Sequence, residues 1–206
     1  PVWGGEKPAW LDERSSMHAK VIAILDHGGR VREFGRGIGW PLGVNVAYRR
    51  DVFERVGLFD NCLGRKWGTL RNQAQREWHL RARAASVRGI YLPEMVVHHL
   101  VPRTRLNRRY FRRWLYWNGI SRAILYRQGG FDIEEPDLEN PPNAGARQFA
   151  GVPRPLLWKA ARSTRSLVWH TLTGNAREAL RHELWLCFFA GVVRQRWSDR
   201  DLPVAS

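Results

Sequence analysis

Residues 42–60 read LGVNVAYRRDVFERVGLFD and combine two local patterns in direct succession. Residues 44–48 are typical of a strand, because β-branched and aromatic side chains dominate them. Residues 50–56 then have the pattern of a short helix. Gly57 closes that helix, and Leu58 is positioned for an apolar contact with its last turn. A strand that runs straight into a helix predicts a mixed α/β architecture.

A second helix and two short apolar runs follow this segment. Residues 74–85 predict a helix with Trp78 on its apolar face. Residues 90–92 and 95–98 are apolar runs separated by a Pro-Glu pair, which predicts two buried strands joined by a tight turn.

The C-terminal half of the sequence is predominantly helical in pattern. Residues 107–128 predict an aromatic and basic helix, and the proline-rich residues 129–155 predict a linker. Two more helices are expected over residues 156–172 and 176–197. The last contains LWLCFFAGVV, whose ten apolar residues are about half of the roughly 20 that span a bilayer. This helix is therefore either a buried core helix or one that lies in a membrane interface.

The composition is strongly basic and rich in tryptophan. The chain has 34 Lys and Arg against 19 Asp and Glu, a net charge of +15, and 11 Trp. This balance favours an anionic partner, such as a membrane surface or a phosphorylated substrate, with a plain solvated surface as the alternative. Because the arginines are spread over every expected helix without a recognised nucleic-acid motif, no specific nucleic-acid partner is expected. Cys62 and Cys187 have no disulfide or zinc spacing, which favours a reducing, cytoplasmic compartment.

Two groups of side chains could carry chemistry. Glu77 is the single acid of the helix at residues 74–85, and His98 and His99 follow the next apolar run. A carboxylate can act as a general base, and imidazole can hold a divalent cation over a phosphate. The structural alternatives are an ion pair for Glu77 and a packing role for the two histidines.

Three stretches together resemble the second half of a family-two, GT-A type glycosyltransferase. They are residues 42–60, residues 76–102 (REWHLRARAASVRGIYLPEMVVHHLVP) and residues 108–126 (RRYFRRWLYWNGISRAILY). In that family a G-x-N-x-A-x-R-R strand and a G-x-F-D turn precede a helix that opens with Glu-Asp. A Y-x-P-x-x-x-V-x-H segment and an aromatic, basic helix follow. The resemblance covers about residues 38–127, with matching spacing throughout.

The resemblance implies the fold and the domain organisation. Residues 1–128 are expected to form an α/β remnant of a GT-A Rossmann-like domain, on its acceptor side. Residues 129–155 are the expected linker, and residues 156–206 the expected amphipathic helical extension. The nucleotide-sugar-binding half of the family should precede residue 1, so the chain is expected to be a piece of a longer protein.

The resemblance also assigns roles to individual residues. Asn45 and Arg49 fall on the acceptor-side strand, Asp60 on the turn aspartate, and His98 on the histidine that helps to bind the metal or the diphosphate. Trp78 joins the predicted substrate-binding residues, since tryptophan is common where sugars stack. His98 is the candidate metal ligand.

One departure from the family concerns the catalytic base. The Glu-Asp pair of the family falls on Ala74 and Gln75, and an amide side chain cannot accept the acceptor's proton. Glu77 is the nearest remaining acid and the candidate catalytic residue, although two residues along a helix turn a side chain by about 200°.

The function implied is transfer of a sugar from a nucleotide-sugar to a glycan or lipid-linked acceptor, with Mn²⁺ or Mg²⁺ as cofactor. The basic, Trp-rich helices predict a peripheral position at the anionic inner face of a membrane. The isolated chain is expected to be inactive. The alternative is a non-catalytic basic module that binds a membrane surface.

Overall fold

The computed structural model describes residues 1–34, 40–65, 68–129 and 147–198. The described residues group into two compact units. The first unit comprises Pro1–Gly64 and Gln73–Tyr110, and the second comprises Arg65–Asn72 with the helices from Phe111 onward. Most of the aromatic, basic helix predicted over residues 107–128 thus groups with the C-terminal helices, whereas the sequence-based scheme placed it in the first domain. Most of the expected linker, residues 130–146, lies outside the described residues.

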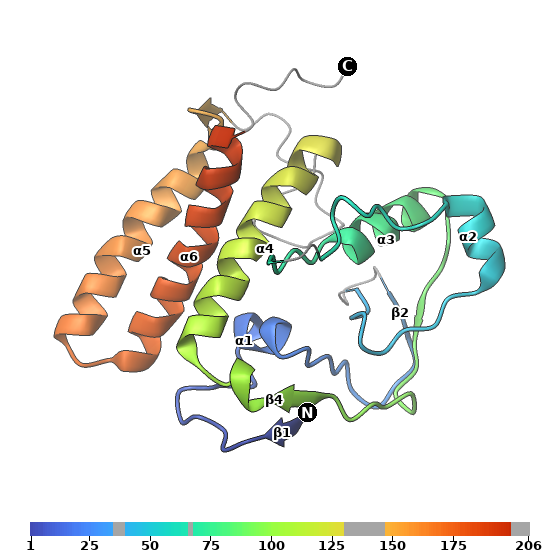
Figure 1. Cartoon of the computed structure of the whole chain (residues 1–206), viewed down its shortest axis with the longest axis horizontal. Coiled ribbons are helices and arrows are strands. Elements are labelled where there is room, and N and C mark those ends of the chain that lie inside the picture. The colour runs from blue at the N-terminus through green and yellow to red at the C-terminus, as the bar shows by residue number, and fades with distance from the viewer. Residues whose placement is uncertain (35–39, 66–67, 130–146, 199–206) are drawn as a thin grey trace. The chain divides into compact units, whose positions relative to one another are not determined.

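The first unit begins with strand β1 (Val2–Gly4), which pairs in parallel with β4 (Leu100–Pro102) so that Val2 lies opposite Leu100. Figure 1 shows the two strands side by side. Helix α1 (Ser16–Val21) follows, and the Ser15 hydroxyl accepts a hydrogen bond from the backbone N–H of His18, which caps the helix. A second ladder joins β2 (Arg32–Glu33) to β3 (Ile90–Tyr91) in antiparallel register.

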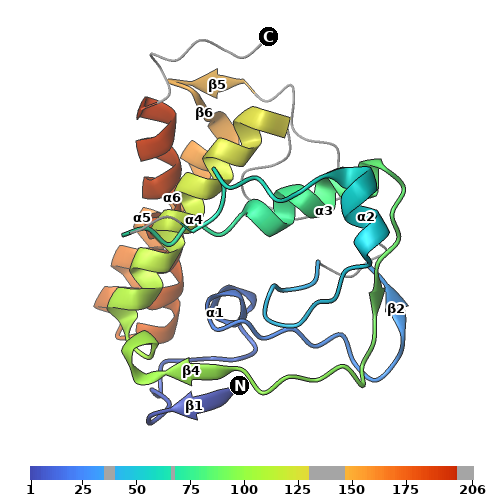
Figure 2. The same ribbon diagram turned by 45° about the vertical axis from the view of Figure 1, so that its right-hand side comes forward.

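Helices α2 (Arg50–Val56) and α3 (Ala74–Ala84) hold the aromatic core of the first unit (Figure 2). The indole of Trp78 is 2% exposed, and its Nε1 donates to the carbonyl oxygen of Gly57 over 2.7 Å. Several side chains pack around this ring, namely Tyr48, Val52, Phe53, Phe59 and Ala82. The end of α2 is thereby tied to the middle of α3.

The end of α2 differs from the sequence-based expectation in one respect. Gly57 closes the helix with a φ of +84°, as a glycine can. Leu58, however, is 77% exposed, so the expected apolar contact with the last helical turn is wrong. Arg81 of α3 holds this turn instead, because its guanidinium donates to the carbonyl oxygens of Val56 and Leu58.

Two of the expected strands are also wrong. Residues 44–48 and 95–98 join no ladder among the described residues. Residues 95–98 are exposed and not buried, and their stretch of chain presents a row of apolar side chains, namely Leu92, Met95, Val96, Val97 and Leu100. Strand propensity alone does not make a strand, since the backbone needs a neighbour to pair with.

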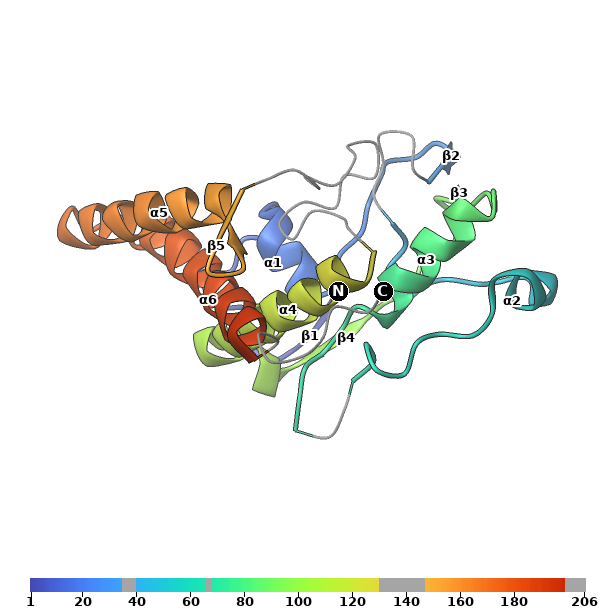
Figure 3. The ribbon, with the colours of Figure 1, turned by 90° about the horizontal axis from the view of Figure 1, so that it is seen from above.

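The second unit is built from α4 (Arg108–Gly129), α5 (Arg154–Leu172) and α6 (Ala176–Ser198). Figures 1 and 3 show α6 between α5 and α4. Strands β5 (Gln148–Phe149) and β6 (Val152–Pro153) form a hairpin that contacts both α5 and α6 (Figure 2). The three helices begin and end within two residues of the bounds predicted from the sequence.

Helix α6 supplies much of the core of the second unit. Leu184, Trp185, Phe188 and Val192 are buried, which favours the core-helix interpretation of the LWLCFFAGVV run. Within the described residues, the helices are too short or too polar to cross a bilayer. Across both units the elements define an α+β architecture dominated by helices. The sheets formed by the described residues have two strands each. The coarse fold class predicted from the sequence is confirmed.

Candidate functional site

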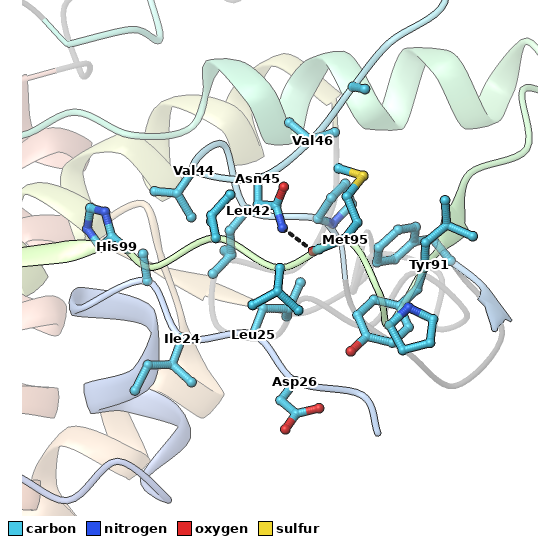
Figure 4. A pocket seen from close by; sticks show the side chains of 18 of the residues that line it. Ile24, Leu25, Asp26, Leu42, Val44, Asn45, Val46, Tyr91, Met95 and His99 are labelled. Carbon is cyan, nitrogen blue, oxygen red and sulfur yellow. Dashed lines mark hydrogen bonds between the residues drawn. The ribbon is translucent and has the colours of Figure 1, made fainter. Parts of the chain in front are cut away.

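The first unit contains a cavity of about 620 Å³. Its walls come from the chain around Ile24, from residues 41–47 and from residues 90–99. Most lining side chains are apolar, and the polar ones are Asp26, Asn45, Tyr91 and His99 (Figure 4). An apolar concave surface with a few polar groups is typical of a ligand site.

Asn45 lies in the wall of this cavity. Its Nδ2 donates to the backbone carbonyl oxygen of Met95 over 2.5 Å, as the dashed line in Figure 4 shows. The amide therefore fixes residues 41–47 against the segment that follows the turn at Pro93-Glu94. Asn45, a predicted substrate-binding residue, thus lines the cavity, and its Nδ2 already donates a hydrogen bond within the protein.

Arg49 and Asp60 lie outside the cavity wall. Arg49 is the residue before α2, its side chain is 83% exposed, and its guanidinium makes two 3.0 Å hydrogen bonds to the carboxylate of Asp51. Asp60 accepts a 2.7 Å hydrogen bond from the backbone N–H of Cys62, which closes a turn. The structure does not bring these two residues together with Asn45 around the cavity, and their predicted substrate role stays a prediction.

Glu77 is held in a bidentate ion pair. Nε and Nη2 of Arg81 donate to its two carboxylate oxygens over 2.5 and 2.9 Å, one turn along the same helix. The same arginine fixes the end of α2, so the pair contributes to the packing of α2 on α3. Both oxygens of the carboxylate are thus engaged by strong, charge-assisted hydrogen bonds within the protein. This geometry favours the structural alternative for Glu77.

Gln75 takes part in a hydrogen-bonded chain that the sequence did not predict. Its Nε2 donates to the hydroxyl oxygen of Tyr48 over 2.7 Å, and that hydroxyl lies 2.9 Å from Nε2 of His79. That hydroxyl donates to His79 or accepts from it according to which ring nitrogen of His79 carries the proton. The indole of Trp40 stacks on the His79 ring, with centroids 5.1 Å apart and planes 3° from parallel.

The buried surroundings of His79 and Tyr48 shift the pKa values of both side chains. Burial, together with the charge of Arg76, lowers the pKa of His79 to about 4, and burial raises the pKa of Tyr48. His79 is therefore neutral at pH 7. The indole of Trp78, the preceding residue, is buried, so neither face of its ring is open to a substrate. Its role in the structure is packing.

His98 is exposed, while His99 is half-buried and lines the cavity. Within the described part of the chain, His98 belongs to no group of three side chains able to hold a metal ion. Protein side chains of the described residues therefore do not by themselves form a site for Mn²⁺ or Mg²⁺ at His98, since such ions need several oxygen ligands, and these would have to come from a bound diphosphate. A group of this kind does occur elsewhere, at His170, Glu178 and His182 of the second unit.

Comparisons of the chain with protein-family models, with curated proteins and with solved structures found no match.

Proposed function

We propose that this chain is the acceptor-side portion of a GT-A type glycosyltransferase that transfers a sugar from a nucleotide-sugar to a glycan or lipid-linked acceptor. The observation that carries the proposal is the set of three motifs between residues 42 and 126, with their matching spacing. We also propose that the first unit forms part of the Rossmann-like sheet of such an enzyme.

The surface of the first unit supports this proposal. Residues 92–100 turn at Pro93-Glu94, pass beside the cavity and expose Leu92, Val96 and Val97 to solvent. Among the described residues the ladders β1–β4 and β2–β3 each have two strands, and a sheet usually needs three or more strands, or a helix packed on it, to be stable in water. A further chain segment that paired with either ladder would enlarge that sheet. It would also cover the exposed apolar side chains beside the cavity.

The proposed enzyme has no carboxylate on α3 that is placed to act as its base. Gln75 donates to Tyr48, and the carboxylate of Glu77 is engaged by Arg81. Neither group is therefore placed to deprotonate an acceptor hydroxyl. We expect no hydrolysis or transfer of a nucleotide-sugar by the chain alone, and any steady turnover would contradict this.

The first test is isothermal titration of uridine and guanosine diphosphates into the protein, with and without Mn²⁺. His98 offers one exposed imidazole, so we expect Mn²⁺ to reach it only together with a diphosphate, whose oxygens are the ligands that such ions prefer. The affinity for the diphosphate in Mn²⁺ should then fall about tenfold or more in His98→Ala, as for loss of a metal contact.

The matched control is His99→Ala, which removes the neighbouring imidazole. An equal loss in the two variants, or diphosphate binding that ignores Mn²⁺, would remove His98 from the proposal. No binding at all by the folded protein would count against nucleotide-sugar chemistry and favour the second candidate function below.

The second candidate is a basic module that binds an anionic membrane surface, and one observation favours it. The outer side of α5 exposes Trp158 (73%), Trp169 (64%) and Leu172 (80%), with exposed Arg162 and Arg165 among them. These positions share one side of the helix at 3.6 residues per turn. Tryptophan beside arginine is the composition of a helix that lies at a lipid headgroup layer.

Vesicle binding tests this second candidate. We expect the protein to sediment with vesicles that contain phosphatidylserine, and to be released by salt, since each basic residue near an anionic surface contributes about 1 kcal/mol. Trp158→Ser with Trp169→Ser should weaken binding about tenfold or more, because each substitution removes a large apolar contact. Leu58→Ser, which removes exposed apolar surface from the first unit, should leave binding unchanged. Equal binding by all variants would show that α5 is not the contact.

A further inference from the structure

The turn between α5 and α6 brings three metal-binding side chains together. His170 lies in the last turn of α5, and Glu178 and His182 lie one turn apart at the start of α6. One ligand atom from each residue lies within 4.8 Å of the others. The two imidazole rings face each other, with centroids 5.8 Å apart and planes 8° from parallel. None of these residues belongs to the proposed glycosyltransferase motifs.

Backbone contacts fix this arrangement. The N–H of Asn175 donates to the carbonyl oxygen of His170 over 2.9 Å, which ties the start of α6 to the end of α5. The Asn175 side chain then caps α6, because its Oδ1 accepts from the N–H of Glu178 over 3.2 Å. Gly174 makes the turn with a φ of +72°. The three side chains are thus held on a short, well-connected turn.

A cationic group already lies between two of the three side chains. Nε of Arg181 donates to Oε2 of Glu178 over 2.8 Å, and its Nη2 lies 3.3 Å from Nε2 of His182. A guanidinium can only donate, so Nε2 of His182 presents its lone pair to the cation.

We propose that His170, Glu178 and His182 bind a divalent transition-metal ion, with Zn²⁺ as the ion they fit best. Two imidazoles and a carboxylate suit Zn²⁺ and its neighbours in the transition series, whereas Mg²⁺ and Ca²⁺ prefer oxygen ligands alone. Zinc sites that carry three protein ligands of this kind complete their tetrahedral coordination with water.

Binding requires two small rearrangements. The side chain of Arg181 is 58% exposed and is free to turn into solvent when a metal takes its place beside Glu178. Tetrahedral bonds of about 2.0–2.1 Å place ligand atoms roughly 3.3 Å apart, so the half-buried side chains must close in from their present separation. The metal would then join α5 to α6 across their turn.

The test is titration of ZnCl₂ into the full chain, in a Cys62→Ser background because Cys62 is an exposed thiol that can itself bind zinc. We expect one site. Loss of a group that only orients a metal ligand already costs about 10- to 100-fold in affinity, so His170→Ala and His182→Ala should each cost about 100-fold or more. Glu178→Gln, which conserves shape, should also weaken binding.

Two further variants sharpen the test. His98→Ala removes an exposed imidazole of the first unit and should leave this zinc affinity unchanged. Arg181→Gln removes the competing cation and should strengthen binding. Zinc at about 100 times its Kd should raise the Tm by roughly 5–10 °C in the background protein but not in His170→Ala. Absence of zinc binding, or binding that survives both histidine substitutions, would overturn the proposal, as would weaker binding by Arg181→Gln.

Discussion

Replacing Gly119 with alanine is expected to destabilise the second unit by about 3 kcal/mol, the upper range for forcing extra atoms into a well-packed core. A Cβ at this position of α4 would lie 2.0 Å from the carbonyl oxygen of Phe188 in α6. The contact is reciprocal, because a Cβ on Gly191 of α6 would lie 2.0 Å from the carbonyl oxygen of Tyr116 in α4. Backbone atoms cannot move aside as a side chain does, so the helices would have to separate.

The measurement is the free energy of unfolding from denaturant titration, followed by helical circular dichroism. Alanine is the better helix former by about 1 kcal/mol, so a net loss of stability can only come from the contact between the helices. Ala190→Leu is the matched control, since it adds more volume to an exposed position next to Gly191 and should change stability by about 0.5 kcal/mol or less.

The pair of glycines offers a second, independent check. Once one alanine has separated α4 from α6, the second finds its space already open. We therefore expect the double variant Gly119→Ala with Gly191→Ala to lose less than the sum of the single losses. Strictly additive losses, or a stable Gly119→Ala protein, would mean that the two helices do not approach through these glycines.

The helices could be predicted from the sequence because their signals are local. Helix α2 begins and ends where the pattern of residues 50–56 and Gly57 predicts. Helices α5 and α6 differ by no more than two residues from their predicted bounds, because the turn at Gly174 and Asn175 separates two clear periodic patterns. The close approach of α4 to α6 could not be predicted, since a helical glycine has no local signature for what it faces.

The strands were harder to predict because a strand depends on its partner. Residues 95–98 have strand composition and yet pair with nothing in the described part of the chain. Val2 and Trp3 favour a strand, but three residues are too few to predict one, and they form a strand because Leu100–Pro102 lies beside them. The short helix α1 was missed because its six residues give too little periodicity to recognise.

The candidate site shows the same division between local and distant information. The sequence identifies Gln75 as an amide at the expected base position, and the 3.6-residue repeat is enough to allow a pair between Glu77 and Arg81. The contact between Tyr48 and His79 joins residues 31 positions apart, so no spacing reveals it. His170 and His182 likewise meet only because α5 and α6 fold back on each other.

The buried His79 is expected to make the stability of the first unit depend on pH. Its pKa of about 4 in the folded protein lies below the value of about 6.5 for an unfolded chain. Between these values the unfolded chain takes up a proton that the folded protein refuses, so stability falls as pH falls from about 6.5 to about 4. A difference of this size corresponds to about 3 kcal/mol, and the loss should stop below the folded pKa.

The expected loss can be assigned to His79 by comparison with His79→Gln, whose amide can still accept from Tyr48 and does not titrate. Denaturant titrations of both proteins from pH 7.5 to pH 4 give the difference in stability at each pH. As the pH falls across this range, the stability of His79→Gln relative to the original protein should rise by about 3 kcal/mol. His18, whose pKa is also lowered by burial, is present in both proteins and cancels. Parallel stability profiles for the two proteins would mean that His79 is not held neutral, and the hydrogen-bonded chain from Gln75 through Tyr48 would then have to be abandoned.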